Sequence, residues 1–278
     1  MAVYVADETL SLPRDDQPIW RYLTFTKMVA MMLDRVLHFS RADTFLDSFE
    51  IGIPRHDMAA ARQWTATALA DGTISRNGLL SYLAAMTNQP RPSFERMDND
   101  QLVTQTMRYT SRALFVNSWH LNEGESAAMW DLYLGAEPGV AIQSTVGSLR
   151  EQVDAGSGDT EVFLGTVEYL DYAVDSWGDF RAFNRVFHKR SSFEHERELR
   201  AVIVRPRYAE LANLDLDTVL AAARDGIDVP IAVDRLVRQL WISPRADEWF
   251  GSLVERVVAQ FDIEIPIVRS HLYDAPDY

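Results

Sequence analysis

The sequence predicts an α+β fold in which short-stranded central sheets carry a helical insertion. Short segments rich in aromatic and β-branched residues are separated by helical patterns, without the regular strand–helix alternation of a doubly wound sheet. A block of helical periodicity covers residues 57–112. No glycine-rich phosphate loop of the P-loop or Rossmann type occurs, which argues against a P-loop NTPase and a dinucleotide-binding dehydrogenase.

The predicted strands share apolar, aromatic and β-branched side chains. Residues 199–204 (LRAVIV) are the most continuous apolar run and indicate a buried strand, which Pro206 ends. Residues 19–25 (IWRYLTF) indicate a strand near the start of the chain. The other predicted strands are residues 36–40, 113–119, 139–144, 161–170, 230–233, 240–242 and 265–272.

The predicted helices combine a period of 3.6 residues with good capping residues. One helix follows Thr26, another covers residues 126–134, and a third covers residues 208–224. Ser243 and Pro244 suit the cap and the first turn of a last helix, because Ser accepts from free backbone amides and Pro needs no hydrogen bond there.

The domain organisation follows from these patterns. Residues 1–18 contain several Pro and Asp residues before any sustained pattern, so we expect a flexible N-terminal arm. We interpret residues 19–278 as a single α+β domain. The helical insertion at about 57–112 belongs to it, because its apolar faces look too small to bury a core alone. Its three helices are expected to begin at Asp57, Asn77 and Asn99.

Charge and composition exclude several classes of function. The chain has 27 Lys and Arg against 41 Asp and Glu, a net charge of −14, which argues against bulk binding of nucleic acid. It has no cysteine, which excludes disulfides, cysteine-ligated metals and a cysteine nucleophile. No segment approaches the roughly 20 apolar residues of a membrane span, and the first residues lack a signal-peptide pattern. We therefore expect a cytoplasmic protein with no membrane partner.

Four clusters of aromatic and polar residues stand out, and in this order they resemble a bacterial family described mainly as a domain of unknown function. The family's pattern runs W-R-Y, then F-S-x-x-x-x-F-x-D-P-F-E, W-x-x-x-x-E-S-x-x-M-W-x-x-Y, F-x-x-E-x-E-x-R and I-S-P. The resemblance covers nearly the whole chain, with Ser48 in place of the usual Pro. The matching residues are Trp20, Arg21, Tyr22, Phe39, Ser40, Phe45, Asp47, Phe49, Glu50, Trp119, Glu125, Ser126, Met129, Trp130, Tyr133, Phe193, Glu196, Glu198, Arg200, Ile242, Ser243 and Pro244.

The layout is also similar to that of ADP-ribosyltransferases, which bind NAD and break its nicotinamide–ribose bond. They too carry an Arg on an early strand, a Ser on a middle strand and E-x-E on a late strand. The resemblance implies a split sheet, in which Arg21 holds the phosphates or ribose, Ser118 supports the nicotinamide and Glu198 is catalytic. It also implies NAD as co-substrate and an unidentified macromolecular acceptor, as for a toxin or phage-defence effector. The usual Ser-Thr-Ser motif is replaced here by residues 117–119 (NSW).

Cleavage of this bond requires the residue types that the chain offers. The ribose carbon becomes positively charged as nicotinamide leaves, and a fixed carboxylate stabilises that charge. If Glu196 and Glu198 lie two apart on one strand, they point to the same face, so that one stabilises the cation and the other positions an acceptor. The aromatic candidates for stacking on the nicotinamide are Tyr22, Trp130 and Tyr133.

Two other functions remain open. In a non-catalytic binding or regulatory module, the conspicuous residues hold the fold together, with Arg21 and Glu198 as a structural ion pair. A metal-dependent hydrolase or nuclease needs several convergent oxygen ligands, although we assign no metal site. The residues that such an enzyme would use are Asp47, Glu50, His120, Glu123 and Glu125.

Overall fold

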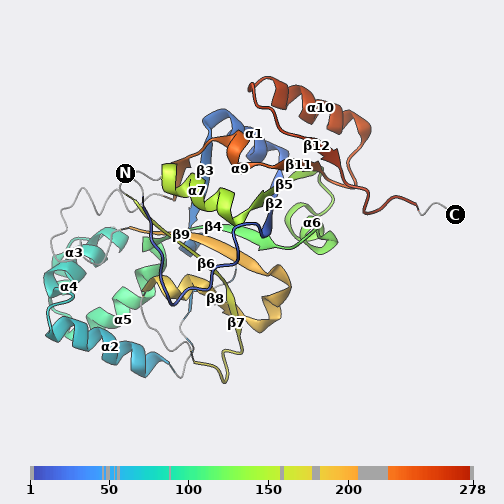
Figure 1. The fold of residues 1–278 in the computed structure, drawn as a ribbon. Helices are drawn as coiled ribbons and strands as arrows, with labels where there is room; N and C mark the ends of the chain where they lie inside the picture. Colours follow the sequence, from blue (N-terminus) through green and yellow to red (C-terminus); the bar gives the residue numbers. More distant parts are fainter. Residues whose placement is uncertain are drawn as a thin grey trace.

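The computed structural model describes residues 3–45, 47, 51–52, 54, 57–87, 89–156, 160–176, 182–205 and 225–275. The described part is a mixed α and β structure, as the sequence predicts, with helices around one large mixed sheet (Figure 1). The helix expected at residues 208–224 lies outside the described residues.

The main sheet runs in the order β1, β6, β9, β4, β2, β5, β11, β12; β3 joins it at β4, and β10 pairs with β3. Its strands are β1 (Val3–Tyr4), β2 (Pro18–Thr24), β3 (Val36–Arg41), β4 (Leu114–Leu121), β5 (Gly139–Thr145), β6 (Glu161–Thr166), β9 (Glu198–Val204), β10 (Gly226–Pro230), β11 (Gln239–Ile242) and β12 (Ile267–Arg269). A separate parallel pair consists of β7 (Glu168–Leu170) and β8 (His188–Arg190).

The helices lie mostly between strands in the chain. They are α1 (Phe25–Asp34), α2 (Met58–Ala70), α3 (Arg76–Thr87), α4 (Pro92–Glu95), α5 (Asn99–Tyr109), α6 (Ala127–Leu134), α7 (Val146–Gly156), α9 (Val233–Leu236) and α10 (Glu248–Ala259). Short 3-10 helices are η1 (Ala42–Thr44), η2 (Thr110–Ala113), η3 (Ala182–Phe187) and η4 (Ser191–Glu196).

The sheet forks beside β4. On one edge, β4 pairs with β9 along residues 114–120. On the other edge, β4 pairs with β3 near its start and with β2 near its end, where Trp20 lies opposite His120. Between the residues of β4 that pair with β3 and those that pair with β2, the side-chain amide of Asn117 donates to the carbonyl of His38 at 2.7 Å. This hydrogen bond lies where the backbone pairing along this edge of β4 is interrupted. We call the place where β2 and β3 separate beside β4 the fork.

The two faces of the sheet are covered differently. One face packs against α1, α7, α9 and α10 in the main core, which contains Ile19, Leu23 and Trp119 (Figure 1). Each large apolar side chain buried there stabilises the fold by roughly 1.5–3 kcal/mol. On the opposite face, α6 packs on Trp20 and Tyr22 near the end of β4, and η3 packs near its start. The middle of this second face therefore lies between two apolar clusters.

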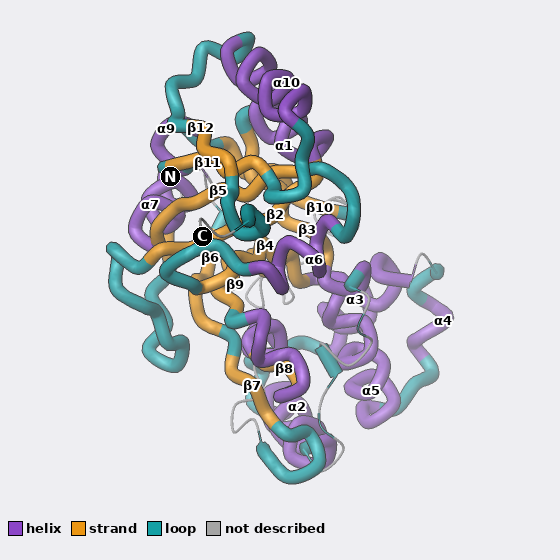
Figure 2. Tube along the Cα trace, turned by 90° about the vertical axis from the view of Figure 1, so that its right-hand side faces the viewer, coloured by secondary structure: helices purple, strands orange, loops and turns teal. Residues whose placement is uncertain are grey.

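The helical insertion forms as expected and contains α2 to α5 and η2. Figure 2 shows α3, α4 and α5 grouped to one side of the strands. The N-terminus of α5 is fixed by a capping box, in which Asp98 and Gln101 each accept from the backbone N–H of the other. The insertion buries a cluster that includes Leu83, Phe94 and Leu102, so it has more of a core than its apolar pattern suggested.

Several element boundaries differ from the prediction. The last helix begins at Glu248 with Asp247 as its N-cap, not at Ser243, whose hydroxyl instead accepts from the backbone N–H of Gly139 at 3.2 Å. The α7 helix was not predicted. Residues 161–170 form two strands, β6 and β7, and Val233 begins α9 where a strand was expected.

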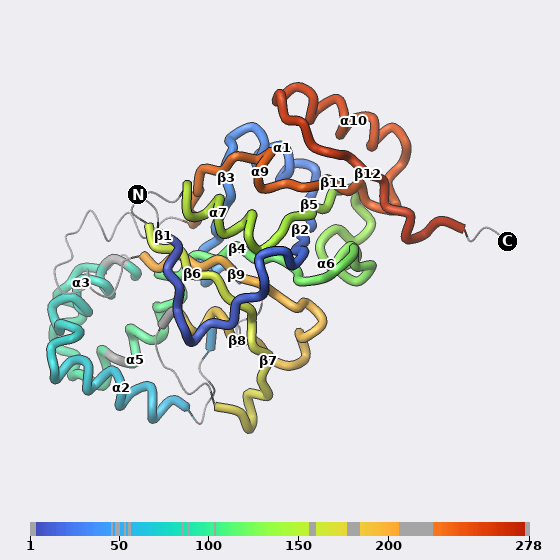
Figure 3. Tube along the Cα trace, in the orientation of Figure 1, coloured from blue at the N-terminus to red at the C-terminus, as the bar shows by residue number. Residues whose placement is uncertain are grey.

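The described part of the expected N-terminal arm is attached to the sheet. Val3 and Tyr4 pair with β6 as strand β1, and the N–H of Thr166 donates to the carbonyl of Ser11 at 2.9 Å. Figure 3 shows this segment running across the sheet from β1 to β2.

No helix within the described residues combines the length and apolar character needed to cross a membrane.

Candidate functional site

Four charged side chains are buried in the middle of the second face, between the clusters under α6 and η3. Lys189, Glu196, Glu198 and Arg200 are 5%, 8%, 4% and 1% exposed. Removing an ion from water costs several kcal/mol, so buried charges need close partners. We call these four residues the charged network.

The network closes around Glu198. Lys189 Nζ donates to Glu196 Oε2 at 2.9 Å and to Glu198 Oε1 at 3.0 Å. Arg200 donates to Glu198 through Nε at 2.7 Å and through Nη2 at 2.9 Å, a two-pronged contact that fixes the plane of the carboxylate. Arg200 Nη1 also donates to the carbonyl of Val186 at 2.6 Å. Both oxygens of Glu198 are thus held by cations.

The two carboxylates have pKa values displaced in opposite directions. Burial by itself raises the pKa of Glu198, but Arg200 and Lys189 outweigh it and hold that pKa well below its usual range. Burial is the largest effect on Glu196 and raises its pKa. The negative charge of Glu198 adds to this increase, and the hydrogen bond from Lys189 opposes it only in part. Neighbouring carboxyls with separated pKa values are the arrangement from which enzymes make an ion and a proton carrier.

The raised pKa of Glu196 predicts a specific pH dependence of stability. A group whose pKa is raised by folding stabilises the native state fully below its unfolded pKa, and this contribution is lost as pH rises through the folded pKa. We therefore expect the unfolding free energy of the native protein to lose this contribution between about pH 4, which lies below the ordinary glutamate pKa of 4.5, and pH 8, and we expect Glu196→Gln to reduce that loss. Urea unfolding at both pH values measures this difference. An identical pH dependence in both proteins contradicts the assignment.

Glu196 and Glu198 do not meet in the way the sequence suggested. Glu196 is the last residue of η4, and Glu198 is the first of β9. Between them Arg197 adopts a left-handed conformation with φ of 41°, so strand alternation does not apply. Instead, Lys189 on β8 bridges the two carboxylates.

Three further side chains border the network. The Tyr169 hydroxyl accepts from the backbone N–H of Glu198 at 2.8 Å. His120 Nδ1 donates to the carbonyl of Glu196 at 2.7 Å, and burial lowers the pKa of this imidazole, so at neutral pH Nε2 is a proton acceptor. Burial and the nearby Glu198 raise the pKa of Tyr133, which keeps its hydroxyl protonated.

The three aromatic candidates form one group, but they differ in access. Tyr22 stacks on Tyr133 with ring centroids 6.2 Å apart and meets the edge of Trp130 at 4.8 Å. The Tyr22 hydroxyl accepts from the N–H of Ser126, and the Trp130 indole donates to Glu125, each at 2.8 Å. Tyr22 and Trp130 are buried, whereas Tyr133 is 47% exposed. Among the three, Tyr133 offers a ring to a ligand, and the other two support α6.

Ser118 and Arg21 lie on opposite faces of the sheet. Ser118 pairs with Arg200 and therefore shares the face of the charged network. Trp20 lies opposite His120, which in turn lies opposite Glu198, so the next residue, Arg21, alternates to the other face. The expected convergence of Arg21 with Ser118 and Glu198 on one face is therefore not what the register gives.

Arg21 is the first residue of β2 beyond the fork. Its guanidinium carbon lies 5.9 Å from the ring centre of Trp119, and its buried Nη1 has no hydrogen-bond partner in the described part of the chain. Burial lowers the pKa of Arg21 to about 10. Arg21 and Tyr133 are close enough for each to affect the pKa of the other. An incompletely partnered cation thus sits within electrostatic reach of Tyr133.

Sequence reasoning missed two members of this site. No role was assigned to Lys189 from the sequence, and His120 was considered only as a possible metal ligand. Lys189 could have been found from charge balance, because two buried carboxylates beside a single Arg need a second cation. The signal for His120 is positional, since pairing β4 with β9 puts it opposite Glu198.

The metal ligands considered from the sequence have other partners. Asp47 binds Arg190 at 3.0 Å, Glu123 accepts from Gln17 at 3.0 Å, and Glu125 binds Trp130. Glu50 lies outside the described residues. The residues that the structure describes contain no group of three or more His, Asp or Glu placed to hold a metal ion.

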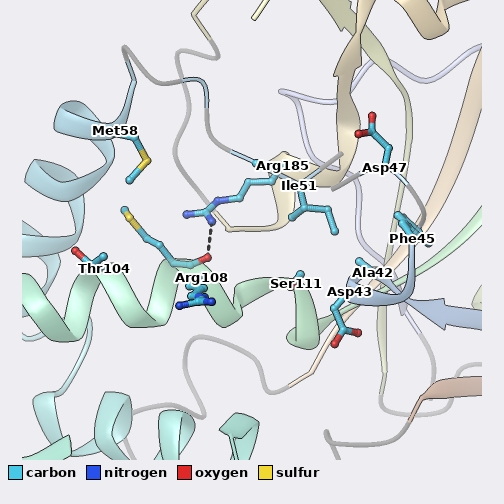
Figure 4. Close-up of a pocket in the computed structure, with 12 residues that line it drawn as sticks. Ala42, Asp43, Phe45, Asp47, Ile51, Met58, Thr104, Arg108, Ser111 and Arg185 are labelled. Atoms are coloured by element: carbon cyan, nitrogen blue, oxygen red, sulfur yellow. Dashed lines mark hydrogen bonds between the residues drawn. The ribbon is translucent and has the colours of Figure 1, made fainter. Parts of the chain in front are cut away.

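A cavity of about 420 Å³ adjoins the network, between α5 and the segment after β3 (Figure 4). The ring of Phe45 in its wall lies 5.7 Å from the Arg200 guanidinium carbon. Asp47, also in the wall, binds Arg190, the residue after Lys189.

Comparison of the chain with protein-family models, curated proteins and solved structures gives no match in any of the three.

Proposed function

We propose that the protein is an ADP-ribosyltransferase-like enzyme that cleaves the nicotinamide–ribose bond of NAD and transfers ADP-ribose to a macromolecular acceptor. In this proposal it acts in the cytoplasm as a toxin or phage-defence effector. The observation that carries the proposal is the pair of neighbouring carboxylates with separated pKa values, Glu198 and Glu196, beside the fork of the sheet. The partly exposed ring of Tyr133 lies near the same pair.

The network residues have distinct tasks in this reaction. Glu198 stays ionised and is held rigidly by Arg200, so its charge is fixed next to the ribose before positive charge develops there. When the carbon–nitrogen bond breaks, its electron pair leaves with nicotinamide. The acceptor forms the new bond to the ribose carbon, and its proton passes to the ionised form of Glu196 or to Nε2 of His120.

The fit of NAD to these residues rests on Arg21 and Tyr133. The buried Nη1 of Arg21 lacks a hydrogen-bond partner within the described residues, and a diphosphate oxygen supplies one. The exposed part of the Tyr133 ring supplies a surface on which the nicotinamide stacks. Arg21 lies beside the fork but on the face of the sheet opposite Glu198, so in this proposal NAD passes through the fork to contact both residues.

Nicotinamide release tests the proposal. We expect Glu198→Gln to slow release from NAD at least about 100-fold, because it removes a preorganised charge. Glu194→Gln, an exposed neighbour, is the matched control and keeps full activity. Chromatography of nicotinamide gives the rate, and circular dichroism checks the fold. Absence of NAD binding and of nicotinamide release in the native protein, with lysate present, refutes the proposal.

The closed contacts of Glu198 favour a second candidate, a non-catalytic binding or regulatory module. Both of its oxygens already accept hydrogen bonds from cations, as in a structural network. In this case native protein and Glu198→Gln both leave NAD intact, and the substitution lowers the melting temperature. Activity in the native protein separates the two candidates.

A further inference from the structure

We propose that the cavity beside α5 is a second ligand site, which binds a phosphate ester of about mononucleotide size. This inference is independent of NAD cleavage. The volume of about 420 Å³ falls within the roughly 300–1,000 Å³ typical of small-molecule sites. The described walls come from three places: the helical insertion, the residues after β3 (Ala42, Asp43, Phe45, Asp47, Ile51 and Gly52), and η3, which supplies Arg185.

Two arginines in the wall of the cavity favour an anion as the ligand. Arg185 is 4% exposed, and its Nη1 donates to the carbonyl of Met107 at 3.2 Å. Figure 4 shows its guanidinium extending between Met58 and α5. Arg108 also lines the cavity and is exposed, and no carboxylate among the described residues forms an ion pair with it. Two guanidiniums at one small cavity favour a phosphate group.

Asp43 and Asp47, the acidic residues of the wall that the structure describes, already have cationic partners. Asp43 binds Arg41 at 2.6 Å and Arg112 at 3.2 Å, and Asp47 binds Arg190 at 3.0 Å. In Figure 4 both carboxylates point away from the Arg185 guanidinium. Neither therefore cancels the attraction of the cavity for an anion.

The rest of the wall fits the body of such a ligand. Phe45, Ile51, Met58 and Met107 supply apolar surface, and the two methionines can adapt to a flat ring. The hydroxyls of Thr104 and Ser111 supply polar contacts of the kind that orient a sugar. An apolar part and a phosphate are thus both accommodated, as in a nucleoside monophosphate.

Isothermal titration calorimetry of the full chain with AMP tests the proposal. We expect AMP to bind, adenosine to bind at least about tenfold more weakly, and Arg108→Gln to weaken AMP about tenfold, as loss of a charge-assisted contact does. Arg62→Gln, an exposed change on α2 outside the cavity wall, is the matched control and leaves AMP affinity unchanged. Inorganic phosphate is expected to bind more weakly than AMP, because it lacks the apolar part.

The outcomes separate this site from the proposed NAD site. Tyr133→Leu should leave AMP binding intact, because Tyr133 does not line the cavity. No AMP binding, equal affinities for AMP and adenosine, or equal effects of Arg108→Gln and Arg62→Gln overturn the proposal. Loss of AMP affinity in Tyr133→Leu assigns the nucleotide to the other site and also overturns it.

Discussion

Arg200→Met is expected to lower the free energy of unfolding by about 3–5 kcal/mol, the usual cost of breaking a buried ion pair by removing one partner. Arg200 holds Glu198 through two hydrogen bonds and supplies a donor to the carbonyl of Val186. Without it, Lys189 alone must neutralise Glu198 and Glu196. Denaturant unfolding followed by circular dichroism gives the value.

A double variant shows whether the loss comes from the stranded charge. In Arg200→Met with Glu198→Leu, Lys189 and Glu196 remain as a simple pair at 2.9 Å, and the removed ions are replaced by apolar groups. We expect this variant to recover at least half of the loss. Arg238→Met, at an exposed position, controls for the substitution itself. A loss below about 1 kcal/mol in Arg200→Met shows that the network does not hold the fold.

The sequence predicted the strands of the site better than their relative positions. β2, β4 and β9 were expected, because short apolar runs rich in β-branched residues, such as LRAVIV, favour buried strands. Glu198 was also singled out from the sequence, and it lies at the centre of the charged network. The pairing register of these strands could not be predicted from the sequence, although a shift of one residue moves every side chain of a strand to the other face of the sheet. The sequence therefore could not show that Arg21 faces away from Glu198.

Other differences have local physical causes. The helix α7 begins with Val146, Gly147 and Ser148, a poor helical start that is stabilised by Thr145, whose hydroxyl accepts from the N–H of Ser148. Ser243 and Pro244 suit a helix start, but the Ser243 hydroxyl is used by Gly139 on β5. In both cases a contact outside the local pattern decided the structure.

Arg21→Met is expected to change stability and ligand binding in opposite directions. Burial lowers the pKa of Arg21 to about 10, so at neutral pH the folded state carries a charge that it disfavours. The cost persists below that pKa and fades as pH rises above it. An apolar side chain of similar length avoids this cost, and we expect a gain of about 1–2 kcal/mol in unfolding free energy at pH 7.

The same substitution should weaken NAD binding at least about tenfold, because it removes the donor assigned to the diphosphate. Lys27→Met, at an exposed position on α1, is the control and should change neither quantity. Unfolding in guanidinium chloride and calorimetric titration with NAD measure the two effects. A less stable variant shows that Arg21 supports the fold. A more stable variant with unchanged NAD affinity removes Arg21 from the ligand site. A gain in unfolding free energy together with weaker NAD binding shows that this half-buried charge is kept for binding.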